Sequence, residues 1–183
     1  MNSNITIQKT IPEDALEVGE VFYKTWLATY PNEEFGVTKD DIEFMFKDRK
    51  LRDGSKFGNL PENEIHLNAK DNGHVVAVCR LIKHNPVGDP AGSDKNELKA
   101  IYVLPEYQGR GIGKMFWNEA LKFFDPTKNT IVNVVTYNTN AIKFYKKLGF
   151  EDTGKRMLDE RFRMQSGAIP PEMEMMIHAS KSF

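Results

Sequence analysis

Two spacings of apolar residues divide the chain into predicted helices and strands. Apolar residues that recur every three or four positions are typical of a helix with one buried face, and strict alternation is typical of a half-buried strand. The helical spacing predicts helices over residues 12–29, 38–46, 111–124 and 138–148. Alternating and short continuous apolar runs predict strands near residues 5–8, 64–69, 75–82, 97–104, 131–135, 153–164 and 172–178.

Capping and turn residues support these boundaries. Thr38 and Asp41 have the spacing of a capping box at the start of the second helix. Asn72 and Gly73 predict a hairpin turn, because both residue types accept positive φ. Residues 85–94 contain two prolines and two glycines, which predicts a loop.

The resulting order of elements is β-α-α-β-β-β-α-β-α-β-β. A doubly wound parallel sheet requires strict alternation of strands and helices, which this order lacks. The order therefore favours an α/β fold of the α+β kind, with a mixed sheet and helices on both faces.

Composition places the chain among ordinary globular proteins. Of its 183 residues, 40% are hydrophobic and 28% are charged, and no apolar run reaches the ~18 residues of a membrane span. This balance predicts a single domain over residues 1–183. The chain has 25 Lys and Arg against 26 Asp and Glu, a net charge of −1, so we expect neither nucleic acid nor a membrane as a partner.

Cysteine and histidine usage narrows the chemistry further. The single cysteine, Cys79, excludes an internal disulfide, and its apolar neighbours predict a buried, inert thiol. The histidines have no metal-ligand spacing, so we expect no metal site. The N-terminus lacks the apolar core of a signal peptide, which makes a cytoplasmic location the expectation.

The most informative segment is a glycine-rich turn between a predicted strand and a predicted helix. It reads Gln108-Gly109-Arg110-Gly111-Ile112-Gly113-Lys114. Unpaired N–H groups and the positive dipole at the start of the helix favour a bound phosphate, and Arg110 and Lys114 add positive charge. The glycines are too close together for a Walker loop, and Lys114 stands where a dinucleotide fingerprint needs glycine.

Two separated motifs resemble the signatures of the GNAT acyl-CoA N-acyltransferases. Residues 108–113 match Q/R-x-x-G-x-G/A, and residues 138–150 match N-x-x-A-x-x-x-Y-x-x-x-G-F. The resemblance covers about residues 5–178 and is looser over residues 31–62 and 85–94. It implies a seven-stranded, mostly antiparallel sheet that is split near its middle.

The resemblance also implies acetyl-CoA as the co-substrate. In the family the loop amides bind the pyrophosphate of coenzyme A. The pantetheine arm pairs with the preceding strand, where a bulge often frees backbone N–H groups. Here the N–H of Tyr102 or Val103 would polarise the thioester carbonyl. The implied cofactor-binding residues are Ile101, Tyr102, Val103, Gln108, Gly109, Arg110, Gly111, Ile112, Gly113, Lys114 and Asn138, with Asn140 less favoured than Asn138.

Two side chains match the family's catalytic positions. Tyr145 matches the tyrosine assigned as the acid for the leaving thiolate, and a phenol is protonated at neutral pH. The alternative is a core tyrosine, because Tyr145 lies on an apolar stripe. Glu97 is the candidate base, and strand alternation is expected to place it on one face with Lys99 and Ile101. The alternative for Glu97 is an exposed carboxylate at a strand end.

The acceptor is expected to bind between the first two helices. Trp26 and Tyr30 offer aromatic walls and Glu33 and Glu34 offer carboxylates, which together suit an organic polycation. Three stretches resemble the spermidine and spermine acetyltransferases: the arrangement Thr25-Trp26…Thr29-Tyr30, the stretch from Glu97 to Gly113, and the ending Pro171-Glu172-Met173-Glu174-Met175. The alternative is that Trp26 packs in the core and the acids form a solvated face.

We therefore expect an enzyme that transfers an acetyl group directly to a primary amine, with a polyamine as the small-molecule acceptor. Two other functions stay open. One is acetylation of a protein N-terminus or lysine, and the other is a non-catalytic acyl-CoA-binding sensor. Homodimers are frequent in the family, but neither the oligomeric state nor the acyl-chain length follows from the sequence.

Overall fold

A seven-stranded sheet organises this computed structural model, which describes residues 4–48, 53–85 and 94–179. The strands are β1 (Ile5–Lys9), β2 (Glu64–Asp71), β3 (His74–Asn85), β4 (Lys95–Val103), β5 (Thr130–Val135), β6 (Glu151–Leu158) and β7 (Pro171–Ile177). The α-helices are α1 (Ala15–Thr29), α2 (Lys39–Met45), α3 (Ile112–Phe123) and α4 (Thr139–Lys147). The predicted order of elements is confirmed, and residues 86–93 of the predicted loop lie outside the described ranges.

The first predicted helix begins three residues later than expected. Pro12–Asp14 form a short 3-10 helix, η1, before α1 starts. The reason is a tertiary contact: the Asp14 carboxylate accepts hydrogen bonds from Lys70 Nζ at 2.6 Å and Asn68 Nδ2 at 2.9 Å. These bonds tie the turn to β2 and hold it tighter than an α-helical turn.

The predicted strand over 153–164 is wrong at its C-terminal end. β6 stops at Leu158, and a 3-10 helix, η5 (Glu160–Phe162), follows. The Asp159 side chain accepts a hydrogen bond from the Arg161 N–H at 3.0 Å, which starts the turn and ends the strand.

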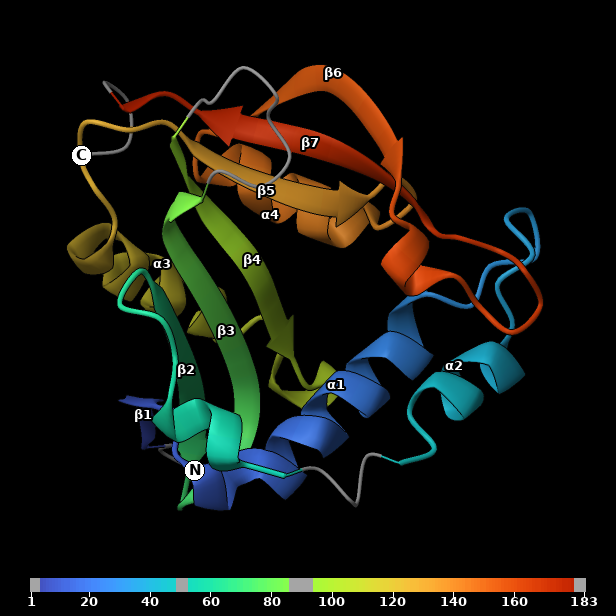
Figure 1. Ribbon diagram of the computed structural model, residues 1–183, viewed down its shortest axis with the longest axis horizontal. Helices are drawn as coiled ribbons and strands as arrows, with labels where there is room; N and C mark the ends of the chain where they lie inside the picture. The colour runs from blue at the N-terminus through green and yellow to red at the C-terminus, as the bar shows by residue number, and fades with distance from the viewer. Residues whose placement is uncertain (1–3, 49–52, 86–93, 180–183) are drawn as a thin grey trace.

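The strands are ordered β1-β2-β3-β4-β5-β7-β6. The pair β4–β5 is parallel, and the other paired strands are antiparallel. β4 and β5 pair only at Asn96 with Thr130 and Glu97 with Ile131. Beyond these residues the two strands diverge, as Figure 1 shows, which is the expected split in the sheet.

A bulge at Lys99 changes which side chains of β4 lie on the same face of the sheet, so the observed faces differ from the predicted ones. Arg80 of β3 pairs with Ala100, whereas Leu81 pairs with Leu98, so Lys99 is the extra residue. The bulge reverses the alternation, and Glu97 therefore shares a face with Ala100 and Tyr102. The prediction that Glu97 and Ile101 lie on one face is wrong for this reason.

Helices cover both faces of the sheet, and two apolar clusters result. α3 and α4 lie behind the sheet in Figure 1, and α1 and α2 lie on its other side. The larger cluster centres on the fully buried residues Phe116, Phe150, Leu81 and Leu98. A smaller one joins α1 and α2 to the connection between β6 and β7, and its buried residues are Trp26, Tyr30, Val37, Ile42, Phe46, Val135 and Met164.

Asp41 connects two segments that are 125 residues apart. Its carboxylate accepts from Thr38 N–H at 2.9 Å and Thr38 Oγ1 at 2.7 Å, which confirms the predicted capping box. It also accepts from Ser166 N–H at 2.8 Å and Ser166 Oγ at 2.9 Å. Burial by itself would raise the pKa of Asp41, but the hydrogen bonds from Thr38 and Ser166 lower it.

Asp41→Ala should lower the free energy of unfolding by about 1–3 kcal/mol, because it removes a helix cap and leaves the Ser166 amide without its acceptor. Urea denaturation at neutral pH measures this loss. Asp40→Ala is the matched control, since Asp40 is exposed on the same turn and should change stability by less than about 0.5 kcal/mol.

The contribution of Asp41 should also depend on pH. A carboxyl with a lowered folded-state pKa stabilises the fold above its unfolded pKa of about 3.9 and loses that contribution as the pH falls through the folded value. The difference between the wild-type protein and Asp41→Ala should therefore shrink below about pH 4. A difference that stays constant down to pH 2 would contradict this assignment.

Candidate active site

The opening between β4 and β5 exposes backbone groups of β4. Leu104 N–H donates to Val76 O of β3 at 3.0 Å. Because hydrogen-bonded pairs alternate along an antiparallel ladder, Tyr102 also bonds toward β3. The N–H groups of Ile101 and Val103 consequently point into the opening. Of the two donors expected from the sequence, Val103 faces the opening, and Tyr102 does not.

The glycine-rich loop closes the end of this opening. Gly109 and Gly111 have φ angles of +76° and +82°, a backbone conformation that other residues rarely adopt. A Cβ built at either position has no heavy atom within 4 Å, so the space beside the loop is open. Gln108 Nε2 donates to Val103 O at 3.1 Å and holds the loop against the end of β4.

The N-terminus of α3 faces outward from the same loop. Gly111 is its N-cap and provides no side-chain cap. The first intrahelical hydrogen bond runs from Met115 N–H to Gly111 O at 3.1 Å, which leaves the amides of residues 112–114 without helical partners. The exposed Lys114 adds a cation. Free amides, the helix dipole and this charge fit a pyrophosphate group.

Arg110, in contrast, is already engaged within the loop. Its guanidinium lies 4.6 Å from the centre of the Tyr107 ring, and Nη2 donates to Glu106 O at 2.8 Å. Its charge still lies beside the exposed amides.

Close packing brings α3 and α4 together beside the loop. A Cβ at Gly113 would lie 2.8 Å from Cζ of Phe144, so only glycine permits this approach. Asn138 caps α4 by accepting a hydrogen bond from Ala141 N–H at 3.1 Å, as predicted. Asn140 is exposed on the first turn of α4.

Tyr145 lies on the inner side of α4. It is 6% exposed, and its ring packs against Phe144 and Phe150 with centroid distances of 5.2 Å and 5.7 Å. Burial raises the pKa of Tyr145 far above its ordinary value, with a smaller contribution from Tyr102. Its hydroxyl is therefore a permanent hydrogen-bond donor at physiological pH.

Glu97 stands at the point where β4 and β5 separate. It is only 3% exposed, so the alternative of an exposed strand-end carboxylate is wrong. Its carboxylate accepts a hydrogen bond from Lys99 Nζ at 3.0 Å, and the bulge places Lys99 where it can make this contact.

Aromatic side chains form a wall on the α1 side of the opening. The Trp26 ring lies 4.6 Å from the Tyr30 ring, 5.5 Å from Phe162 and 6.4 Å from Tyr102. Tyr137 OH donates to Tyr30 O at 2.8 Å and fixes the end of α1 against β5. The buried Nε1 of Trp26 has no hydrogen-bond partner within the described ranges.

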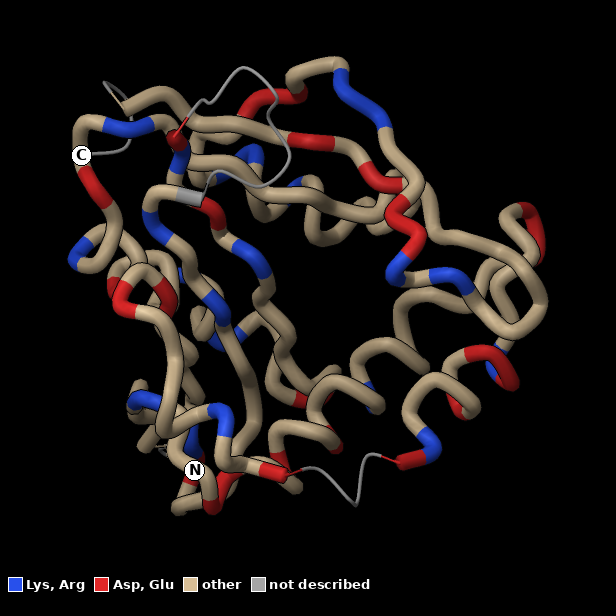
Figure 2. The backbone as a smooth tube through the Cα atoms, viewed as in Figure 1, with Lys and Arg blue, Asp and Glu red and all other residues tan. Residues whose placement is uncertain are grey.

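Glu33 and Glu34 lie apart from this wall. Both are exposed in a turn closed by a bridge between Asn32 and Val37. The loop between α1 and α2 forms the outer end of this pair of helices, on the side away from β4 (Figure 2). The structure therefore packs Trp26 and Tyr30 into a buried cluster and leaves the two acids exposed to solvent, which is the alternative given for this region.

Three charged residues near the opening were not among the predicted site residues. Asp159 is the N-cap of η5, Arg161 lies within η5, and Glu172 is the second residue of β7. Figure 2 shows acidic and basic residues together where β6 leads into η5. Burial raises the pKa of Glu172, and nearby Asp159 and Glu97 raise it further. In the sequence, the alternation of Glu172 with Met173 indicates that Glu172 lies on one face of a strand. It does not reveal which residues of other strands lie on that face.

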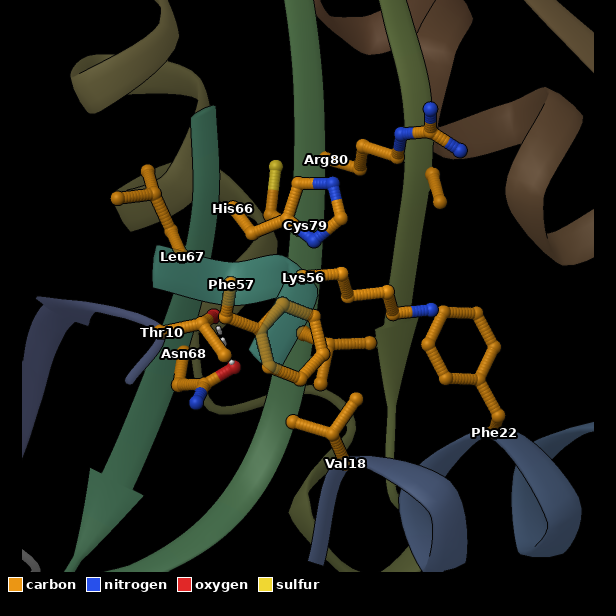
Figure 3. Close-up of a pocket in the computed structure, with 12 residues that line it drawn as sticks. Thr10, Val18, Phe22, Lys56, Phe57, His66, Leu67, Asn68, Cys79 and Arg80 are labelled. Atoms are coloured by element: carbon orange, nitrogen blue, oxygen red, sulfur yellow. Dashed lines mark hydrogen bonds between the residues drawn. The ribbon is translucent and has the colours of Figure 1, made fainter. Parts of the chain in front are cut away.

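A cavity of about 100 Å³ lies elsewhere on the face that carries Tyr102 (Figure 3). Phe22 and the short helix η3 (Ser55–Gly58) line it together with β2 and β3. Arg80 donates to Glu64 from Nε at 2.7 Å and from Nη2 at 3.1 Å, and His66 contacts the same carboxylate. Because these groups satisfy one another, they stabilise the sheet.

Among the residues that the structure describes, no three His, Cys, Asp or Glu residues come close enough together to hold a metal ion. Over the same ranges, no helix combines the length and the apolar character needed to cross a membrane.

Comparison with known proteins agrees with this geometry. The sequence model of the acetyltransferase (GNAT) family matches residues 20–150. The peptidyl-lysine N-acetyltransferase YjaB of Salmonella typhimurium is 38% identical over 63 residues, which are 34% of this chain and 41% of that protein. The chain spans only 37% and 41% of the lengths of two curated relatives that it matches.

Solved structures share the fold. The PaiA N-acetyltransferase of Thermoplasma acidophilum, crystallised with coenzyme A, superposes with a TM-score of 0.63 at 23% identity, over 93% of this chain and 98% of that one. A mutant of the spermidine N-acetyltransferase SpeG of Vibrio cholerae superposes with a TM-score of 0.60 at 20% identity, over 100% and 98%. The match of the family model to most of the chain shows that this protein belongs to the GNAT family of acetyltransferases.

Proposed function

We propose that the protein transfers the acetyl group of acetyl-CoA directly to the primary amine of a small molecule, with a polyamine such as spermidine as the first candidate. The opening between β4 and β5 carries this proposal. It has N–H groups that β5 does not pair along one side, a glycine-rich loop suited to an anion at its end, and the buried aromatic residues Trp26 and Tyr30 on its α1 side. Acetyl-CoA supplies an activated acyl group on a thiol that leaves readily.

The residues of the opening fit coenzyme A. The amides of residues 109–114 would hold its pyrophosphate, with Gln108 bracing the loop. The N–H groups of Ile101 and Val103 would pair with the pantetheine arm, and one of them would donate to the thioester carbonyl. Asn138, at the start of α4, is the proposed side-chain contact to the same arm, beside its capping role.

Tyr145 is the proposed donor to the departing sulfur. The pKa of its hydroxyl is raised by burial, so it carries a proton throughout the working pH range. A neutral hydroxyl stabilises a thiolate by hydrogen bonding or by transferring its proton. Direct transfer requires no nucleophile from the protein. Cys79, the single cysteine, is buried on β3, and burial raises the pKa of its thiol.

The proposed acceptor site lies beside a buried aromatic cluster and several carboxylates. Trp26 and Tyr30 are 6% and 7% exposed, so they would contact the methylene chain and the ammonium groups of a polyamine only through the small part of each ring that is exposed. Glu97, buried beside Lys99, is the carboxylate that the sequence analysis predicts as the base. Glu33 and Glu34, exposed on the outer turn, would attract a polycation from a distance.

Acetylation of a protein lysine is the second candidate. The observation that favours it is the 38% identity to YjaB, whose name describes a peptidyl-lysine N-acetyltransferase. A lysine side chain presents the same primary amine on an aliphatic chain, so it would react through the same residues.

Release of coenzyme A thiol from acetyl-CoA should distinguish the acceptors. The panel contains spermidine, spermine, a short diamine, amino acids and a lysine peptide. Turnover with polyamines but not with the peptide is the expected result. Turnover with the peptide alone would replace the first candidate by the second. If the protein bound coenzyme A tightly and acetylated none of the acceptors, the assignment as an acetyltransferase of amines would fail in favour of a sensor.

Tyr145→Phe should lower kcat by roughly 100-fold, because the variant loses the proton donor for the thiolate while keeping the buried ring. Its dissociation constant for coenzyme A, measured by calorimetry, should stay within about twofold, since the pyrophosphate loop is unchanged. An unchanged kcat would identify Tyr145 as a core residue without a catalytic role.

Gly111→Ala should weaken coenzyme A binding by roughly tenfold, because a side chain at positive φ destabilises the left-handed conformation by about 1–2 kcal/mol. Calorimetric titration with coenzyme A measures the change. Gly58→Ala is the matched control, because Gly58 has open space around it and no positive φ. Equal affinities for the two variants would argue against the loop as the binding site.

A further inference from the structure

Glu172 lies on the same face of the sheet as Glu97, on the opposite side of the opening. Glu97 pairs with Ile131 of β5, and Ile131 pairs with Met176 of β7. Paired residues share a face, and so do residues two and four positions along a strand, so Glu172 faces the same way as Glu97. Glu172 itself pairs with Val135, at the end of β5 where β4 has already diverged.

The carboxylate of Glu172 is the unmatched charge in this region. The other charged groups that face it form pairs: Lys99 Nζ lies 3.0 Å from Glu97 Oε1, and Arg161 Nη2 lies 2.5 Å from Asp159 Oδ2. Within the described ranges, the Glu172 side chain makes neither a hydrogen bond nor an ion pair. A partly buried carboxylate without a partner is unfavourable unless a cation binds to it.

Aromatic rings complete the surroundings of this carboxylate. Burial raises the pKa of Tyr30 most, its contact with Tyr102 raises it further, and the negative charge of Glu172 adds to both. Burial also raises the pKa of Tyr102, and the charge of Glu172 adds to this effect. Both rings lie against Trp26, with centroid distances of 4.6 Å and 6.4 Å. Aromatic faces around one anionic group form a favourable site for an alkylammonium ion.

We propose that Glu172 binds the ammonium group of the acceptor and removes the proton that the amine must lose before it attacks; this proposal rests on the function proposed above. One proton passes from the ammonium to the Glu172 carboxylate. The freed lone pair on nitrogen forms the new C–N bond to the acetyl carbon, and the C–S bond breaks with its electron pair on sulfur. The nitrogen loses a second proton to water as the amide forms. Tyr145 gives its proton to the sulfur and regains one from water. Glu172 finally releases its proton to water.

The charge environment favours Glu172 over Glu97 for this step. Burial, Asp159 and Glu97 raise the pKa of Glu172 against the opposing effects of Lys99 and Arg161, which makes it a stronger base than an ordinary carboxylate. Glu97 is already neutralised by Lys99. Glu97 is then a positioning residue, which holds the Lys99 ammonium beside the proposed site.

The test compares Glu172→Gln with Glu174→Gln in the full-length protein. Both changes remove one negative charge from the same face of β7, but Glu174 is paired with Lys155 at 3.3 Å, outside the proposed site. Glu172→Gln should lower kcat/KM for the amine by roughly 100-fold and leave the KM for acetyl-CoA unchanged. Glu174→Gln should retain the wild-type kcat/KM, and Glu172→Asp should recover part of the loss.

The pH profile separates a catalytic role from a merely structural one. Below its pKa, Glu172 is protonated and cannot accept a proton, so the wild-type kcat/KM should fall as the pH decreases, starting at a higher pH than for an ordinary carboxyl. Glu172→Gln should lack this acidic limb. The proposal is overturned if Glu172→Gln keeps the limb, or if Glu97→Gln alone removes it. Absence of wild-type turnover with every amine, despite coenzyme A binding, overturns the proposed function and this proposal with it.

Discussion

The loss of pairing between β4 and β5 beyond Glu97 is the constraint on which the rest of the site depends. A parallel pair that continued to Val103 would satisfy the N–H groups of Ile101 and Val103 and close the sheet. Because the strands diverge instead, β5 does not pair with these donors, which lie on the side of β4 that leads to the N-terminus of α3. Antiparallel pairs hold the sheet together on both sides of the opening.

One extra residue in β4 decides which charged groups lie where β4 and β5 separate. The bulge at Lys99 turns Glu97 and Tyr102 to the same face and brings the Lys99 ammonium to the Glu97 carboxylate. This ion pair neutralises the charge at the point of divergence. The remaining carboxylate, that of Glu172, then stands opposite without a partner among the described residues. The distribution of charge therefore follows from the register of the strands and not from the number of acidic residues near the site.

Local signals predicted most of the framework because they depend on near neighbours. The capping box of Thr38 and Asp41 and the αL glycines of the loop at 109–111 are consequences of local backbone geometry. Two predictions failed where distant contacts intervened: the Lys99 bulge reversed a strand face, and Asp14 tightened the start of α1 through β2. The early end of β6 has a local cause, the side-chain turn at Asp159.

The sequence by itself determined the order of elements, the glycine-rich turn at residues 108–114 and the position of Tyr145 on the apolar face of α4, because spacing and residue chemistry carry that information. Only the tertiary structure decided which carboxylates meet. Glu33 and Glu34 are near Trp26 in sequence but lie on an exposed outer turn, whereas Glu172, far along the chain, reaches the opening through three strands in register. Side-chain proximity across a sheet depends on pairing between distant segments, and no local pattern encodes that pairing.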